Sequence, residues 1–302
     1  MLAYAHIEVI DVLINEVSKT TGLTKKAIEY YTMQGLVSPN ILENGYRDYD
    51  QSDINKLNTI SILRQLGIST NEIKSVLSDE SRATLQALSI RKELSFQIEQ
   101  AKKLLLEKLS QGQSYSEISK ELQALNNSKT ITEKLLEAFP GYYGRFICLH
   151  FARFLNEPIR TEMQQSAYER IISFLDNAPQ LTLPADLEEY LIEGTKGIGT
   201  EQIIEMIEST KKSIENPDDF LSDNKEVLKR YLAYKQSDEY KNSQAYKIME
   251  LTKEFNRTSG YNDIFITALK ELSPSYSEYH QKLEEANKKL VAHYPEIEKM
   301  ND

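Results

Sequence analysis

Near its beginning the chain reads Ile14-Asn15-Glu16-Val17-Ser18-Lys19-Thr20-Thr21-Gly22-Leu23-Thr24-Lys25-Lys26-Ala27-Ile28-Glu29-Tyr30-Tyr31. Ile14 and Val17 share one face of a short helix, which Gly22 ends because glycine readily adopts the left-handed backbone of a helix terminus. Thr24 is suited to cap a second helix that reaches Gln34. Two short helices joined by a glycine-containing turn predict a helix-turn-helix unit.

The segment that follows predicts a hairpin and two more helices. Asn44-Gly45 is a hairpin turn sequence, since both residues tolerate positive φ angles. Asp50 is suited to cap a third helix, and Ser69 and Glu72 form the pattern of a capping box that opens a fourth. A hairpin behind a helix-turn-helix is a wing, so residues 1–80 are expected to form a winged helix-turn-helix domain.

The composition describes a folded protein of about two domains. The chain has 302 residues, of which 40% are apolar and 27% charged, and its net charge is −10. Net acidity argues against a nucleic-acid binder, but the charge is unevenly spread. Residues 19–64 hold six Lys/Arg against five Asp/Glu, whereas residues 130–302 carry a net charge of −9. The total charge therefore does not decide what the first domain binds.

A long helix is expected over residues 81–110, followed by a linker over 111–129. Apolar residues recur along this helix in steps of three and four, which gives a narrow stripe close to a heptad repeat. The stripe has no obvious partner within the chain, so the same helix of a second subunit is its natural partner; packing on the following domain is the alternative. The expected dimerisation residues are Ala87, Ile90, Leu94, Ile98, Ala101, Leu105 and Leu109.

Four motifs in order make the chain resemble the MerR family of transcription regulators. They are the opening segment quoted above, Gly35-Leu36-Val37-Ser38-Pro39, the wing Glu43-Asn44-Gly45-Tyr46-Arg47-Asp48-Tyr49, and Ile62-Leu63-Arg64-Gln65-Leu66-Gly67-Ile68-Ser69 with Glu72-Ile73. The resemblance covers about residues 13–109. It implies a mostly α fold with a winged helix-turn-helix DNA-binding domain, a long antiparallel coiled-coil dimerisation helix and, over residues 130–302, an all-helical C-terminal domain.

The resemblance also implies a homodimer whose two heads occupy successive major grooves of a palindromic promoter operator in double-stranded DNA. Such a dimer affects RNA polymerase indirectly, through the promoter. Lys and Arg supply charge for phosphate contacts, and tyrosine hydroxyls donate hydrogen bonds to phosphate oxygens. At the matching positions, the residues expected to bind DNA are Thr24, Lys25, Lys26, Tyr30, Tyr31, Asn44, Gly45, Tyr46, Arg47 and Arg64.

Three positions in this region qualify the expectation. One of Tyr30 and Tyr31 is expected to pack in the core, and Tyr49 to anchor the hairpin. Glu29 stands where many members of the family carry a basic residue. Because each neutralised phosphate adds to affinity, the sequence predicts modest, salt-dependent DNA binding.

The C-terminal domain is expected to bind an effector. Metal-sensing members of the family place cysteines just past the dimerisation helix, but the single cysteine here is Cys148, expected to be a small buried hydrophobe. No metal site and no cofactor are expected. Twenty of the 27 Tyr and Phe residues lie beyond residue 130. Tyr143, Phe146, His150 and Phe154 share one helical face, which lines a pocket for a small organic effector or else belongs to the core.

Two further classes of function were weighed. In the alternative interpretation, the dimer is tethered to DNA and its acidic C-terminal domain binds a protein partner rather than a small molecule. An enzyme is not expected, because no nucleophile–base pair, metal-ligand spacing or dinucleotide motif is visible. The apolar runs are too short to span a membrane and no signal peptide is visible, so a cytoplasmic location without membrane association is expected.

Overall fold

The computed structural model describes residues 13–79, 82–139, 141–179 and 181–297; residues 1–12, included in the predicted first domain, lie outside this part. The chain divides into two compact units, Met1–Leu85 and Gln86–Asp302. Helices dominate both, in agreement with the predicted mostly α fold class. None of the described helices is both long and apolar enough to cross a membrane.

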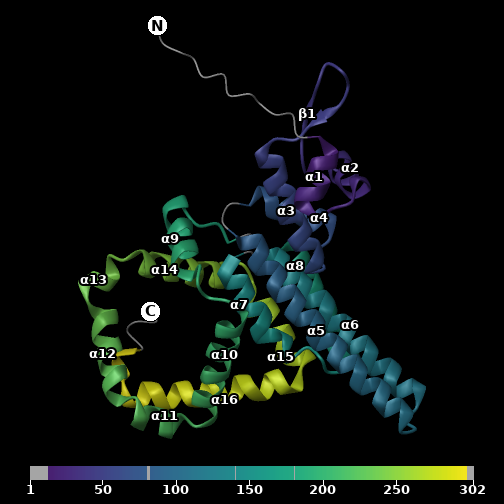
Figure 1. The fold of residues 1–302 in the computed structure, drawn as a ribbon. Helices are drawn as coiled ribbons and strands as arrows, with labels where there is room; N and C mark the ends of the chain where they lie inside the picture. Colours follow the sequence, from purple (N-terminus) through teal and green to yellow (C-terminus); the bar gives the residue numbers. More distant parts are fainter. Residues whose placement is uncertain (1–12, 80–81, 140, 180, 298–302) are drawn as a thin grey trace. The chain divides into compact units, whose positions relative to one another are not determined.

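The first unit, called the head below, consists of short helices and one hairpin (Figure 1). Its elements are α1 (Ile14–Thr21), α2 (Lys25–Met33), β1 (Asn40–Ile41), β2 (Arg47–Asp48), α3 (Gln51–Gln65) and α4 (Thr70–Ser78). Thr24 and Asp50 cap α2 and α3, and Ser69 and Glu72 form the predicted capping box at α4. Gly22 ends α1 with a φ angle of 68°. These boundaries agree with those predicted from the local capping and turn residues.

The head has a core of its own. α1 packs on α2 and on α3, and α3 packs on α4. Each helix and the end of the hairpin contribute a side chain that is fully buried. These residues are Val17, Ile28, Tyr49, Leu57, Ile60 and Ile73.

The second unit starts with a long helical hairpin of α5 (Ala83–Ser110) and α6 (Tyr115–Ala138), which run antiparallel (Figure 1). Gly112 makes the turn with a φ angle of 94°, and Ser114 caps α6 in a capping box with Glu117. This differs from the predicted linker over 111–129 and the predicted boundary at residue 130. Residue 130 lies in the middle of a continuous helix.

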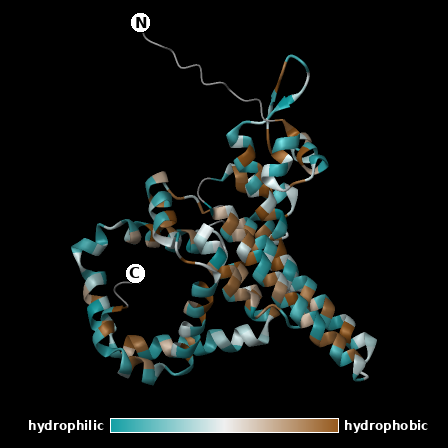
Figure 2. Cartoon of the chain, in the orientation of Figure 1, coloured by the Kyte–Doolittle hydropathy of each residue, from teal (hydrophilic) through white to brown (hydrophobic). Residues whose placement is uncertain are grey.

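The remaining helices of the second unit follow in chain order. They are α7 (Gly141–Ala152), α8 (Glu162–Asn177), α9 (Ala185–Thr195), α10 (Thr200–Glu215), α11 (Pro217–Asp223), α12 (Lys225–Gln236), α13 (Asp238–Lys241), α14 (Gln244–Thr258), the π-helix η1 (Tyr261–Ile266), α15 (Thr267–Leu272), α16 (Pro274–His293) and the 3₁₀ turn η2 (Pro295–Ile297). In Figure 2 the helices around α7 and α8 carry more hydrophobic residues than α12 and α14.

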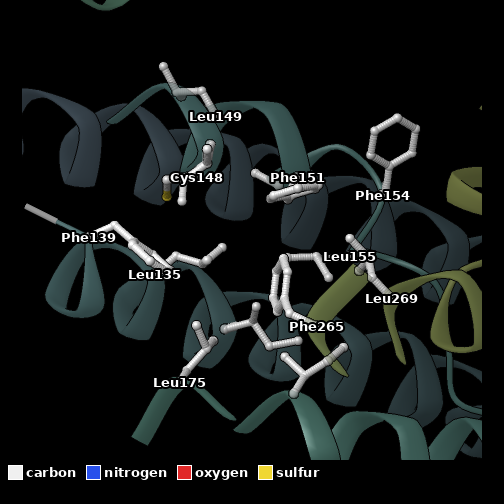
Figure 3. Close-up of a cluster of buried hydrophobic side chains, with 14 of the residues drawn as sticks. Leu135, Phe139, Cys148, Leu149, Phe151, Phe154, Leu155, Leu175, Phe265 and Leu269 are labelled. Atoms are coloured by element: carbon white, nitrogen blue, oxygen red, sulfur yellow. The ribbon is translucent and has the colours of Figure 1, made fainter. Parts of the chain in front are cut away.

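The main core of the second unit lies where α6, α7, α8 and α15 pack together (Figure 3). Leu135, Phe139, Phe151 and Phe265 are among its buried members. Cys148 is fully buried there, with Sγ 3.5 Å from the carbonyl oxygen of Thr132. Burial raises the pKa of the Cys148 thiol to about 12, so the side chain is a neutral, small hydrophobe as expected.

Helices α10 to α14 form an outer circuit. Each of these helices packs on the next one in chain order, from α10 to α14. α16 packs on α10 and α11 and so joins this circuit to α15 and the main core (Figure 1).

Candidate DNA-binding surface

Helix α2, the second helix of the helix-turn-helix, presents a polar face and buries the opposite one. Thr24 Oγ1 accepts a hydrogen bond from the backbone N–H of Ala27 (3.2 Å), which starts the helix. Lys25 and Lys26 are exposed in its first turn. Tyr30, one turn after Lys26, is 45% exposed and therefore lies on the same face. This face combines the Lys26 cation with a phenol hydroxyl, and Lys25 adds a second exposed cation in the same first turn.

Tyr31 does not belong to that face. It is only 7% exposed, and its ring packs edge-on against Tyr30 with centroids 5.6 Å apart. Helical geometry places adjacent residues about 100° apart, so one of two successive tyrosines must turn toward the core. The expectation that Tyr31 binds DNA is therefore corrected, and Tyr30 is the tyrosine that α2 offers to a ligand.

The wing is a short hairpin with an exposed tip. β1 and β2 pair antiparallel, and the backbone N–H of Leu42 donates to the carbonyl of Tyr46 (2.8 Å). Gly45 holds a φ angle of 81°, and Asn44 Oδ1 accepts from the backbone N–H of Tyr46 (3.0 Å). Asn44 and Gly45 thus shape the tip. Tyr46, 64% exposed, and Arg47, also exposed, are the side chains that the wing presents.

Buried groups fix the wing to the head. Tyr49 is fully buried, with its hydroxyl 3.4 Å from Thr32 Oγ1 on α2. The buried carboxylate of Asp53 accepts a hydrogen bond from the backbone N–H of Ser38 just before β1 (3.2 Å). The wing is therefore anchored to both α2 and α3.

Arg64 has a structural contact that the sequence did not show. Its Nη1 donates to the carbonyl of Ile68 (2.8 Å), which stabilises the turn between α3 and α4. The side chain is otherwise exposed. By contrast, Lys25, Lys26 and Arg47 form no salt bridge within the described residues, so their charges are available to an anionic ligand.

Comparison with known proteins agrees with this geometry. Residues 13–80 match the family described as MerR HTH family regulatory protein. The chain is 33% identical over 132 residues to an HTH-type transcriptional regulator CueR of Escherichia coli O6:H1, which covers 83% of that protein and 42% of this chain. The chain belongs to the MerR family. The match to CueR covers 132 residues of this MerR chain, which is more than the head contains, so the similarity continues beyond the head.

Other relatives are similar over stretches about as long as the head. A heavy metal-dependent transcription regulator 2 of Rhizobium meliloti is 41% identical over 75 residues, 24% of this chain and 51% of that protein. An HTH-type transcriptional regulator HmrR of Rhizobium leguminosarum bv. viciae is 39% identical over 80 residues, 26% of this chain and 62% of that protein. The chain thus spans about half of the first of these and less than two thirds of the second. No solved structure matches it.

All of the residues predicted for dimerisation except Ala87 pack against, or line a cavity with, other parts of the second unit. Ile90 and Leu94 belong to the main core of the second unit. Ala101, Leu105 and Leu109 pack with Ile118 and Leu125 of α6. Ile98 faces a small polar cavity of about 20 Å³ between α5, α6 and α7. The statement that the stripe lacks an intrachain partner was wrong, because the stripe of a long helix fits a second helix of the same chain as well as that of another subunit.

The aromatic stripe predicted for an effector also packs internally. Tyr143 packs edge-on against Phe139 (6.0 Å between centroids), and Phe154 is buried against Tyr276 and Tyr279 of α16. The ring of Phe146 stacks on His150 at 6.3 Å. Burial, with a smaller contribution from Arg153, lowers the pKa of His150 to about 4. These residues therefore form part of a packed interior with a neutral histidine.

Within the described residues no cluster of three or more His, Cys, Asp or Glu side chains is placed to hold a metal ion. The name of one relative refers to heavy metals, and its similarity to this chain covers 75 residues, fewer than the head contains.

Proposed function

We propose that two copies of this MerR-family regulator bind a palindromic promoter operator and that each α2 enters a major groove of double-stranded DNA. The observation that carries the proposal is the set of unpaired cations on the head. Lys25 and Lys26 extend from the recognition helix and Arg47 from the wing, all exposed and without a salt bridge to another described residue. In an acidic chain, such cations favour binding to phosphates.

The proposed dimer uses the outer side of α5. Ala101, Leu105 and Leu109 of the predicted stripe pack on α6, whereas Phe96, Leu104 and Leu106 are 58%, 58% and 67% exposed. Phe96 is two positions from Leu94, and a rotation of about 200° turns it to the opposite side of the helix. Exposed apolar side chains in this number on one helix support self-association.

The second unit is proposed to be the regulatory part, which responds to a small organic effector and changes how the heads engage the promoter. In this proposal the regulator affects RNA polymerase indirectly, through the promoter DNA. The regulator acts in the cytoplasm. The packed aromatic stripe of α7 gives no support to an effector pocket at that place, and it favours the alternative of a protein partner for the acidic unit. A cavity elsewhere in the unit, treated below, supports the small molecule.

A selection experiment tests the proposed DNA binding. The full chain is incubated with random duplexes at low salt, and bound duplexes are amplified and sequenced. We expect a palindromic site, and we expect a Lys26→Ala/Arg47→Ala variant to bind this site at least tenfold more weakly. Lys120→Ala, an exposed cation in the second unit, serves as the control and should bind like the wild type. Absence of any enriched sequence, or equal binding by the double variant, would overturn the proposal.

A further inference from the structure

Three helices of the second unit line an apolar cavity that is partly open to solvent. α10 ends at Glu215 and α11 begins at Pro217, which starts helices well because its φ angle is already helical. Only Asn216 separates the two helices, so they diverge from one point, and α16 packs on both (Figure 1). The space between them is a cavity of about 260 Å³.

One face of each helix lines this cavity. Within each helix the lining residues are one, three or four positions apart, as on a single helical face. They are Thr210, Ser213 and Ile214 of α10, Pro217, Phe220 and Leu221 of α11, and Leu283, Ala286, Asn287 and Leu290 of α16. Seven of the ten are apolar and none is ionisable. A dry apolar cavity of about 150 Å³ holds benzene, so this one has room for a compact two-ring molecule.

The two hydroxyl groups of the lining favour a ligand that donates a hydrogen bond, while the Asn287 amide can either donate or accept. The Thr210 hydroxyl donates to the carbonyl of Met206 (2.9 Å) and the Ser213 hydroxyl to that of Ser209 (3.0 Å). Their protons are used within α10, and their oxygens keep lone pairs to accept. A hydroxyl or ring N–H of a ligand is the complementary group.

The charges beside the cavity are balanced. A neighbouring hollow shares Ile214, Pro217 and Ala286 with the cavity and is also lined by Glu215, Lys282, Glu285 and Lys289. Lys289 Nζ lies 2.5 Å from Asp218 Oδ2, and Lys282 Nζ lies 2.7 Å from Glu278 Oε1. Both lysines are thus paired with carboxylates. The surroundings give no excess of positive charge to attract an anion.

The number of lining residues points to a small molecule rather than a protein. Stable protein interfaces use roughly 20–30 residues from each partner, whereas ten line this cavity. Its volume also lies just below the roughly 300–1,000 Å³ of pockets for drug-sized ligands. Both comparisons indicate a compact ligand.

The helix that forms one wall reaches α5 at its other end. α10 has 16 residues and is therefore about 24 Å long. At its start Thr200 Oγ1 lies 3.0 Å from Ser89 Oγ of α5, and the preceding loop accepts a hydrogen bond from Gln86 Nε2 at Lys196 O (3.4 Å). Arg145 Nη1, on the buried side, donates to Ile198 O (3.1 Å). The loop before α10 is thus fixed both to α5 and to α7.

We propose that the cavity between α10, α11 and α16 binds a compact, uncharged, mostly apolar organic molecule with a hydrogen-bond donor, and that α10 transmits its binding to α5. The second half of the proposal rests on the proposed function, in which the second unit regulates DNA binding. Ser89 and Gln86 stand at the start of the second unit, on the helix that continues from the head. A ligand that moves α10 therefore acts on the part of α5 closest in sequence to the head.

Binding is tested on the full chain by isothermal titration with 1-naphthol, and with naphthalene-1-sulfonate as its charged counterpart. We expect one saturable site per chain for 1-naphthol, and at least tenfold weaker binding of the sulfonate. Ala286→Phe fills the cavity and should weaken 1-naphthol binding at least tenfold. Ala292→Phe, the same change at an exposed position of α16, should leave it unchanged. Circular dichroism establishes that both variants are folded.

The proposal is overturned if 1-naphthol does not bind the wild type, if Ala286→Phe binds it as well as Ala292→Phe does, or if the sulfonate binds equally. Transmission is tested with the selected duplex: 1-naphthol should change the operator affinity of the wild type at least threefold, and Ser89→Ala should reduce this change while Ser95→Ala should not. If 1-naphthol changes the operator affinity of Ser89→Ala as much as that of the wild type, transmission from α10 to α5 is excluded. If the wild type without ligand binds no DNA, the proposed function is contradicted, whereas the binding of 1-naphthol in the cavity is not affected by that result.

Discussion

Arg47 gives the most quantitative test of the head as a DNA-binding surface. It is the exposed cation of the wing, next to Tyr46, and it makes no salt bridge to another described residue. Arg47→Ala therefore removes a charge without leaving an acidic partner unpaired inside the protein. Tyr49, which anchors the wing, is untouched, so the head should remain folded.

The expected effect follows from counting charges. Lys25, Lys26 and Arg47 give six cations in a dimer, and six phosphate contacts correspond to a slope of log K against log salt of about −5. Arg47→Ala removes two of them, so the slope should become less negative by about 2. If the two proteins bind equally at 1 M salt, this change in slope weakens binding about thirtyfold at 0.15 M salt.

Fluorescence anisotropy with a labelled operator duplex, titrated at four or more salt concentrations, measures both quantities. Lys120→Ala removes a cation from α6 and should leave the slope at the wild-type value. Thermal denaturation of each variant checks that the fold is intact. An unchanged slope for Arg47→Ala would refute the assignment of Arg47 to phosphate binding. A loss of affinity that is the same at every salt concentration would also refute it.

Three other predictions concern charge, packing and pH. Glu29→Arg should raise operator affinity at low salt, because Glu29 is exposed on α2 between the cations and Tyr30; unchanged anisotropy curves would show that position 29 is not near phosphates. In urea, at a chain concentration low enough to keep the protein monomeric, Leu105→Ala should lower the free energy of unfolding by about 2–3 kcal/mol, whereas Phe96→Ala should change it by less than about 0.5 kcal/mol. At higher concentration Phe96→Ala should weaken the dimer in sedimentation; the reverse pattern would indicate that the predicted stripe forms the dimer interface. His150 has a pKa of about 4 in the folded protein, against the ordinary 6.5. Between these values only the unfolded chain binds the proton as the pH falls, so the free energy of unfolding should decrease by at most about 3 kcal/mol. His150→Phe should show a correspondingly smaller decrease, and an equal decrease would assign the titration to another group.

The head could be predicted from the sequence because its signals are local. Thr24, Asp50 and Ser69 accept hydrogen bonds from residues three positions on, and Asn44-Gly45 closes a loop of a few residues. Such interactions depend on neighbours in the chain. Tyr31 shows the limit of this reasoning, since the choice between Tyr30 and Tyr31 depends on how α2 packs on the rest of the head.

The second unit was harder to predict because its contacts are distant in sequence. The stripe on α5 was identified, but its partner on α6 was not, although Ser114 and Glu117 already contained the capping box that starts α6. The sequence predicts one helical face for Tyr143, Phe146, His150 and Phe154, but α7 ends at Ala152 and Phe154 lies beyond it; Phe154 packs against Tyr276 of α16, more than a hundred positions later. The cavity was missed because it requires three such faces at once; the spacing of Leu283, Ala286 and Leu290 was the only visible signal.

Hydroxyl-radical footprinting of the full chain on its selected operator tests the central claim most directly. A dimer with α2 of each head in a major groove should protect two patches related by a two-fold axis, with centres about 34–36 Å apart, and Lys26→Ala/Arg47→Ala should remove both. A single asymmetric patch, or protection that persists in the double variant, would contradict the account.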